Sequence, residues 1–110
     1  MGFTKIEHFE DVFIEEARIF KALGHPARLA IVKMLLEKRT CVGTDFTVSI
    51  PLAQPTISQH LRELKDAGII RGRVEGTAVC YCVNIDVIDK MKSSFLPILN
   101  DFIKSQNCDC

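Results

Sequence analysis

An amphipathic helix that runs directly into a β-hairpin constrains the fold of this chain more than any other feature. The sequence predicts this helix over residues 54–67, with Gly68 as the residue that ends it. Apolar side chains at spacings of four and three form its inner face, namely Ile57, Leu61 and Leu64. Two β-favouring runs follow over residues 69–74 and 77–83, joined at residues 75–76, which is typical of a hairpin. This order of elements predicts a mainly helical α+β fold.

Further helices are predicted before and after this unit. Apolar periodicity indicates helices over residues 6–23 and 26–38, and Pro26 suits the first position of the second helix because its missing N–H has no partner there. The apolar residues of that second helix cover a wide arc, so we expect it to be the central core element; they are Leu29, Ile31, Val32, Leu35 and Leu36. A brief helix is expected over residues 45–50, and a final helix over residues 86–104 that is capped by its first residue.

Two helices joined by a short turn and followed by a hairpin form a winged helix-turn-helix. This arrangement inserts one helix into a major groove of DNA and lays the hairpin loop along the neighbouring backbone. Gln59 can bond an adenine edge in bidentate fashion, and Arg71 and Arg73 flank the hairpin loop. The candidates for DNA contact are Gln54, Thr56, Ser58, Gln59, Arg62, Lys65, Arg71 and Arg73. The alternative is an ordinary surface helix with a solvated polar face.

Charge and composition narrow the function further. Fourteen basic and fourteen acidic side chains cancel, so any DNA binding must come from the local placement of basic groups. The chain has no basic head followed by a long apolar run, and no apolar run of about twenty residues, so we expect a cytoplasmic protein without a membrane anchor. No enzyme is expected, because none of His8, His25 and His60 has a recognisable catalytic context.

Three motifs carry a family resemblance. Residues 22–29 read Ala-Leu-Gly-His-Pro-Ala-Arg-Leu, residues 54–61 read Gln-Pro-Thr-Ile-Ser-Gln-His-Leu, and residues 67–70 read Ala-Gly-Ile-Ile. Together they resemble the ArsR/SmtB family over nearly the whole chain. The resemblance implies a dimeric winged-helix repressor that releases operator DNA when a metal, metalloid or thiol-reactive signal binds. It adds His60 on the reading helix and Thr77 on the wing to the DNA candidates, although His60 could instead seal the helix against the hairpin.

The resemblance also implies that the first and last helices form a dimer interface. Residues 1–23 and 86–104 would then flank a DNA-binding core of residues 24–85 within a single domain, with a flexible tail at residues 105–110. Apolar residues along the last helix step by three, four, four and three, a narrow seam that suits pairing with another helix. The expected interface residues are Phe9, Phe13, Ile88, Met91, Phe95, Leu99 and Phe102.

The five cysteines form the candidate effector site. Their odd number, without a secretion signal, argues against a disulfide framework and for thiols in a reducing compartment. Cys80 and Cys82 are two apart on a predicted strand, so both side chains leave the same face. In a winged helix the short strand that would hold Cys41 usually pairs with this strand, and three thiolates suit As(III) or Sb(III). We expect Cys41, Cys80 and Cys82 to bind the effector, with Cys108 and Cys110 as a second choice.

The usual metal sites of the family do not carry over by resemblance. Arsenic-sensing members often have Cys-Val-Cys at the start of the third helix, whereas residues 41–43 here read Cys-Val-Gly. The zinc site on the last helix uses His and carboxylates, but no His follows His60, so we expect no zinc site there.

Other interpretations of the cysteines stay open. Cys80 and Cys82 could be small core residues, since free Cys is among the most buried residue types. Exposed thiols at Cys108 and Cys110 would be open to oxidation, so a redox- or persulfide-responsive repressor is the main alternative. A small metal carrier, or a winged helix used only for protein contacts, are rivals from other classes.

Overall fold

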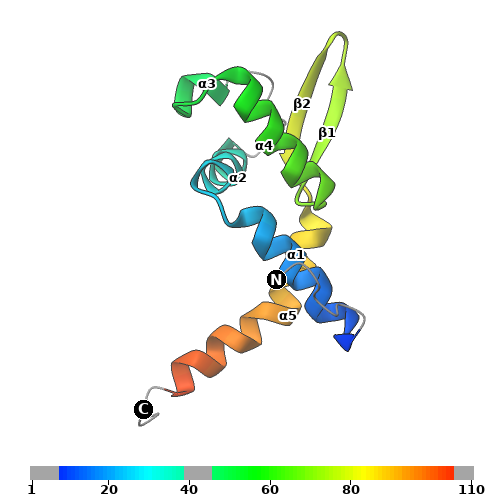
Figure 1. Ribbon diagram of the computed structural model, residues 1–110, viewed down its shortest axis with the longest axis vertical. Coiled ribbons are helices and arrows are strands. Elements are labelled where there is room, and N and C mark those ends of the chain that lie inside the picture. The colour runs from blue at the N-terminus through cyan, green and yellow to red at the C-terminus, as the bar shows by residue number, and fades with distance from the viewer. Residues whose placement is uncertain (1–7, 39–45, 106–110) are drawn as a thin grey trace.

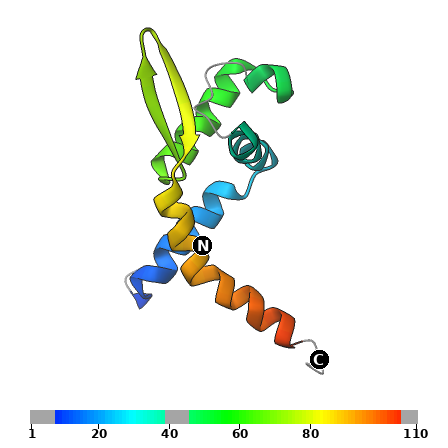
Figure 2. The ribbon, with the colours of Figure 1, turned by 180° about the vertical axis from the view of Figure 1, so that it is seen from behind.

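The computed structural model describes residues 8–38 and 46–105, and within them it shows helices and one hairpin arranged as a winged helix-turn-helix (Figure 1). The elements in chain order are α1 (Asp11–Leu23), α2 (Pro26–Lys38), α3 (Phe46–Ser49), α4 (Gln54–Asp66), β1 (Ile70–Glu75), β2 (Ala78–Val83) and α5 (Ile85–Lys104). Helices α3 and α4 lie beside the hairpin at one end of the molecule, and α5 extends toward the other end (Figures 1 and 2). The fold class predicted from the sequence is confirmed.

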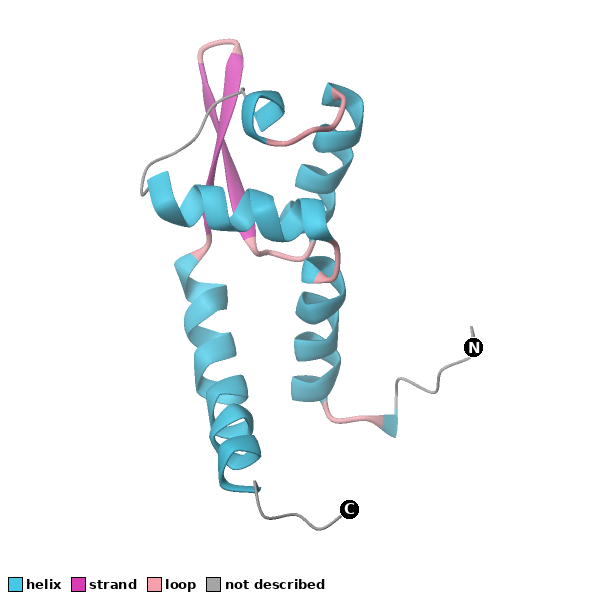
Figure 3. Ribbon diagram, turned by 90° about the vertical axis from the view of Figure 1, so that its left-hand side faces the viewer, coloured by secondary structure: helices cyan, strands magenta, loops and turns pink. Residues whose placement is uncertain are grey.

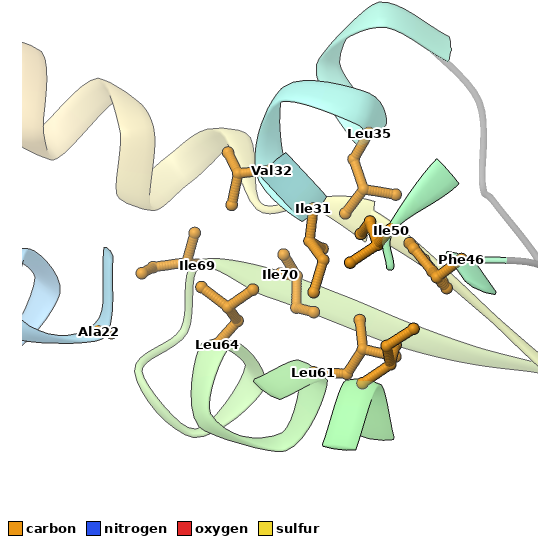
Figure 4. Close-up of a cluster of buried hydrophobic side chains, with 11 residues drawn as sticks. Ala22, Ile31, Val32, Leu35, Phe46, Ile50, Leu61, Leu64, Ile69 and Ile70 are labelled. Atoms are coloured by element: carbon orange, nitrogen blue, oxygen red, sulfur yellow. The ribbon is translucent and has the colours of Figure 1, made fainter. Parts of the chain in front are cut away.

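The core lies where α2, α4 and the base of the hairpin meet (Figure 4). The three residues predicted to form the inner face of α4 are buried, which confirms the helical spacing; they are Ile57, Leu61 and Leu64. Ile31 of α2 and Ile69, just before β1, pack in the same cluster. Each such side chain contributes about 1.5–3 kcal/mol when it is removed from water, so this cluster fixes α4 against the rest of the chain.

Helix α2 is covered on one side only, so the prediction that its whole apolar arc is core was wrong. Ile31, Val32 and Leu35 are buried, but Leu29 and Leu36 are 48% and 49% exposed. Residues seven apart lie two turns apart on one helix face, and this pair occupies the face turned away from α4 and the hairpin.

Two predicted boundaries move by a few residues. Helix α1 begins at Asp11, whereas the sequence predicted a helix from residue 6, and residues 9–10 just before it are not helical. In the hairpin Glu75 pairs with Ala78, so the loop consists of residues 76–77, one position later than predicted. Gly76 has a φ of +63° and Gly68, which follows α4, has a φ of +78°; both values favour glycine. The role of Gly68 in ending α4 is as predicted.

Helix α5 begins at Ile85 and is capped by Asn84, not by Asp86 as the sequence suggested. The Asn84 Oδ1 accepts the backbone N–H of Asp86 at 3.2 Å, and its Nδ2 donates to the Gly68 carbonyl at 2.9 Å. Because a cap oxygen satisfies an otherwise free N–H in the first turn, the residue two places before Asp86 is the better cap. Asn84 thereby ties α5 to the end of α4.

Helix α5 lies outside the main core, whereas α1 reaches the core at its end through Ala22. The two helices extend from the same side of the winged part (Figure 3). They meet at an edge-to-face contact between Phe20 and Phe95, with ring centroids 4.6 Å apart, and at an ion pair between Glu15 and Lys90. No residue of α5 is fully buried. Of the residues expected in a dimer interface, four are exposed, namely Phe9, Phe13, Leu99 and Phe102, and three are half-buried, namely Ile88, Met91 and Phe95. None of the described helices is long and apolar enough to span a membrane.

Candidate nucleic-acid interface

The outer face of α4 presents a continuous set of polar side chains to solvent. All six residues that the sequence predicted to look outward or sideways are exposed; they are Gln54, Thr56, Ser58, Gln59, Arg62 and Lys65. The buried side of the same helix fixes its rotation about its own axis, so this face is held outward by packing. The Gln54 Nε2 donates to the Ser58 Oγ at 3.2 Å, which links two of these residues across one turn. Helix α4 therefore has the form of a reading helix on a rigid base.

The first turn of α4 offers fewer backbone donors than the sequence suggested. Pro55 has no N–H, and the N–H groups of Thr56 and Ile57 both donate to the Ala53 carbonyl, at 3.0 and 3.1 Å. An anion at a helix N-terminus relies on such groups being free. Phosphate contacts at this end of α4 would therefore come mainly from side chains.

His60 is a packing residue of α4. Its side chain is only 9% exposed, and its Nδ1 accepts a hydrogen bond from the Arg28 Nε at 3.1 Å. Burial lowers the pKa of His60 from its ordinary value of 6.5, and the nearby His25 and Arg28 lower it further. A side chain in this position is not presented to a groove. Its hydrogen bond and its ring contact are with Arg28 and His25 at the start of α2 and not with the hairpin, the packing partner that the sequence suggested as the alternative to DNA contact.

The two arginines of the wing lie at different positions along β1, Arg73 nearer the loop and Arg71 nearer the base. Arg73 lies on the outer half of β1 and forms an exposed ion pair with Glu75. Arg71 lies near the base, where it donates to the Asn84 Oδ1 at 2.9 Å and to Asp86 at 3.0 Å. The expectation that both arginines flank the loop was therefore wrong for Arg71, because the strands continue beyond it. Thr77, in the loop itself, is exposed as predicted.

Two of the candidate effector cysteines lie on β2, and they differ. Cys80 is buried and disulfide-bonded, whereas Cys82 is half-buried and has a free thiol. They point to one face of the strand, as predicted, and Tyr81 packs against the core from the other. The expectation of a free Cys80 thiol was wrong. Among the described residues no three His, Cys, Asp or Glu side chains converge as a metal site, and the other three cysteines lie outside those residues.

Sequence reasoning missed the polar cluster behind α4. Arg28 of α2 bonds His60 and, through Nη1, the Ala22 carbonyl at 3.2 Å. The rings of His25 and His60 are in contact in a tilted arrangement, with centroids 4.4 Å apart. Arg28 and His60 are 32 positions apart, so no local pattern joins them; the only signal was the presence of His25 and Arg28 in one of the family motifs.

Comparison with known proteins places this geometry in a family. Residues 25–71, from the start of α2 to the first residues of β1, match the model of the bacterial regulatory protein, arsR family. An uncharacterised HTH-type transcriptional regulator of Methanocaldococcus jannaschii is 43% identical over 76 residues, which cover 69% of this chain and 82% of the relative. The chain belongs to the ArsR family. The resemblance seen in its motifs is thus confirmed, and its relatives are transcriptional regulators.

Two further similarities extend beyond the matched segment. The arsenical resistance operon repressor of Staphylococcus xylosus is 30% identical over 96 residues, covering 87% of this chain and 88% of the relative. The solution structure of a homodimeric winged helix-turn-helix DNA-binding domain from Mycobacterium bovis superposes with a TM-score of 0.64 at 22% identity, covering 99% of this chain and 97% of that chain. The fold, including the outer helices, is therefore that of an ArsR-family regulator.

Proposed function

We propose that this ArsR-family regulator is a dimeric repressor that places α4 of each protomer in a major groove and its wing on the flanking DNA backbone. The observation that carries this proposal is the outer face of α4. Its exposed residues are amides, hydroxyls and two cations, above three apolar side chains that hold the helix rigidly. Gln59 can read a base edge, while Arg62 and Lys65 can neutralise phosphates.

The wing supplies a further phosphate contact at little cost. Arg73 and its partner Glu75 are both well exposed, and exposed ion pairs contribute only about 0–1 kcal/mol. The guanidinium of Arg73 can therefore exchange Glu75 for a DNA phosphate. Arg71 is bonded to Asn84 and Asp86 and so links the base of the wing to the start of α5.

Dimer formation is supported by the apolar surface on the outer helices. Four of the expected interface residues are exposed in the single chain, and α5 carries further exposed apolar residues, among them Ile98 and Ile103. The Mycobacterium bovis domain with the same fold is described as homodimeric. Because the chain has no net charge, two reading helices acting together would supply the affinity that one cannot.

Gln59→Ala should weaken binding to the operator by about five- to 100-fold, because a bidentate base contact is worth about 1–3 kcal/mol. Arg73→Ala should weaken binding to all sequences and lower the salt slope by about one. The measurement is fluorescence anisotropy on a duplex from the DNA upstream of the chain's own coding region, repeated over a range of salt concentrations.

The matched control is Lys104→Ala, which removes the same charge at the far end of α5. It should leave both affinity and salt slope unchanged. Wild-type binding by both Gln59→Ala and Arg73→Ala would refute the groove assignment. Absence of any salt-dependent DNA binding, together with tight metalloid binding, would favour a small metal carrier.

For the effector we propose As(III) or Sb(III), held by the thiolates of Cys41, Cys80 and Cys82 after the disulfide at Cys80 is reduced. The placement of Cys80 and Cys82 on one face of β2, a strand of the wing, supports this choice. So does the arsenical resistance repressor among the relatives. Three thiolates suit a soft, thiophilic centre.

The disulfide at Cys80 favours a second candidate, a repressor that responds to thiol oxidation. The two candidates make different demands on Cys82. A set of three thiolates needs it, whereas the disulfide at Cys80 forms while Cys82 stays free.

Cys82→Ser therefore separates the two candidates. With fully reduced protein we expect arsenite or antimonyl tartrate to release the wild type from DNA and to leave the Cys82→Ser variant bound. If oxidation is the signal, diamide should release the wild type and the Cys82→Ser variant equally, and Cys80→Ser should abolish that release. Anisotropy with Zn(II) and Cd(II) as parallel additions completes the test. Metalloid release that persists when Cys41, Cys80 and Cys82 are all replaced by Ser would eliminate the proposed site.

A further inference from the structure

The start of α2 and the middle of α4 are joined by a cluster of two imidazoles and a guanidinium. The rings of His25 and His60 are in contact with centroids 4.4 Å apart and are tilted by 44° to each other. Arg28 bridges from α2 to both neighbours, donating through Nε to the His60 Nδ1 at 3.1 Å and through Nη1 to the Ala22 carbonyl of α1 at 3.2 Å. Three helices therefore meet at this one cluster.

Both rings accept a hydrogen bond at Nδ1. The backbone N–H of Ala27 donates to the His25 Nδ1 at 3.0 Å, just as Arg28 donates to the His60 Nδ1. A ring nitrogen that accepts a hydrogen bond carries no proton, so the bond from Arg28 fits a neutral His60 whose single proton is on Nε2. A further proton would have to bind at Nδ1 and would remove the acceptor.

The surroundings of His60 favour its neutral form. Burial is the largest cause of the lowered pKa of His60, followed by His25 and Arg28, while Glu63 of α4 acts in the opposite direction. Next to His25 and Arg28 lies an open cavity, whose other charged lining residues are Arg18, Lys21, Glu63 and Asp66. A protonated His60 would thus be a buried cation against a guanidinium, with Glu63 as the carboxylate that acts on it.

We propose that Arg28, His25 and His60 are positioning residues that hold α4 in its DNA-binding orientation, and that protonation of His60 releases this hold. The proposal rests on the proposed function, since it concerns the helix that would read DNA. His60 adjoins Gln59, so a change in how His60 packs rotates or shifts the outward face directly. Arg28 belongs to α2 and reaches α4 through its bond to His60.

The direction of the pH effect follows from the chemistry. In the unfolded chain His60 has its ordinary pKa of 6.5, and in the folded chain that pKa is lower. Between the folded and the unfolded pKa of His60 the folded chain therefore binds fewer protons than the unfolded chain. The contribution of His60 to the free energy of unfolding is complete above pH 6.5 and is lost as the pH falls through the lower, folded pKa. DNA affinity should follow the same course, high at neutral and alkaline pH and falling on acidification.

The test compares the wild type with the double variant His25→Asn, His60→Asn. An asparagine Oδ1 can occupy the place of the imidazole Nδ1 and accept the same hydrogen bond, but it does not titrate. Asn is also a good residue at the position before Pro26, where a helix N-cap is needed. Anisotropy on the upstream duplex at constant ionic strength should show wild-type affinity falling about tenfold between about pH 7.5 and pH 5.5. The affinity of the double variant should change by no more than about twofold over the same interval, relative to its own value at the upper pH.

A pH dependence in the double variant as steep as that of the wild type would overturn the proposal. Nitrogen-15 NMR of the histidines, free of DNA, gives an independent readout. It should show an unprotonated Nδ1 on His60 at neutral pH, and a proton on that atom would overturn the proposal even if the variants fail to fold. If the wild type binds no DNA at any pH, the proposed function fails. The NMR spectrum still shows whether the Nδ1 of His60 carries a proton.

Arg28→Lys adds a test of positioning. Lysine keeps the charge but lacks the planar guanidinium group, which donates to His60 and to the Ala22 carbonyl at the same time. The affinity of the Arg28→Lys variant should fall about fivefold at neutral pH, with the dimer intact by sedimentation. Unchanged affinity in this variant would show that Arg28 does not position α4.

Discussion

Replacing Leu99 with Asp should convert the proposed dimer to a monomer and lower operator affinity by about 100-fold or more. Leu99 is 45% exposed in the single chain and belongs to the second half of α5. That half of the helix extends away from the core (Figure 1). Phe102 and Ile103 beside it are also exposed, so the surface that would close around Leu99 is apolar. An unpaired carboxylate in such an interface costs several kcal/mol, more than the apolar contact it replaces contributes. Without the dimer, each reading helix binds its half-site alone.

Leu36→Asp provides the control for this prediction. Leu36 is 49% exposed on α2 and is not among the residues expected in the interface, so the substitution adds the same charge at a similar exposure. Sedimentation equilibrium should show a dimer for Leu36→Asp and a monomer for Leu99→Asp. A Leu99→Asp protein that stays dimeric and binds DNA normally would place the dimer interface elsewhere and remove the apolar seam of α5 from the proposed function.

Most of the helices and the hairpin could be predicted because their signals are local. Spacings of three and four marked the inner face of α4, and Pro26 marked the first residue of α2. The rule that Gly follows a helix in the left-handed conformation located the end of α4 at Gly68. These choices depend on neighbours within one or two turns, so a single sequence contains them.

Features that depend on distant partners were missed or misjudged. Leu29 and Leu36 have the same apolar character as Ile31, and only the positions of α4 and the hairpin decide that they stay exposed. The role of His60 was left open because its partner Arg28 is on another helix. The disulfide at Cys80 has no local signal at all, and the odd number of cysteines argued against it. The capping of α5 by Asn84 is the exception, since a cap residue before an acidic first turn is a local pattern that could have been seen.

The candidate DNA contacts show the same division. The exposed face of α4 was predicted correctly, because a helix with one buried side must expose the other. The wing was predicted less well, because the height of Arg71 on the hairpin depends on the register of the two strands and on bonds to Asn84 and Asp86. The exposed residues of an interface are thus predicted best on a helix, because the helical spacing alone decides which side chains face outward.

Ile57→Ala should destabilise the folded chain by about 3 kcal/mol and lower Tm by about 10–20 °C. Ile57 is 0% exposed and packs from α4 into the cluster that also holds Ile31, so its loss leaves a cavity under the reading helix. The matched control is Ile85→Ala at the start of α5, where the side chain is 60% exposed and the same deletion should change stability by less than about 0.5 kcal/mol. Urea unfolding at one fixed protein concentration measures both, because the stability of a dimer depends on concentration. Equal and small effects of the two substitutions would mean that α4 is not anchored through Ile57, and a reading helix without that anchor could not hold its polar face toward DNA.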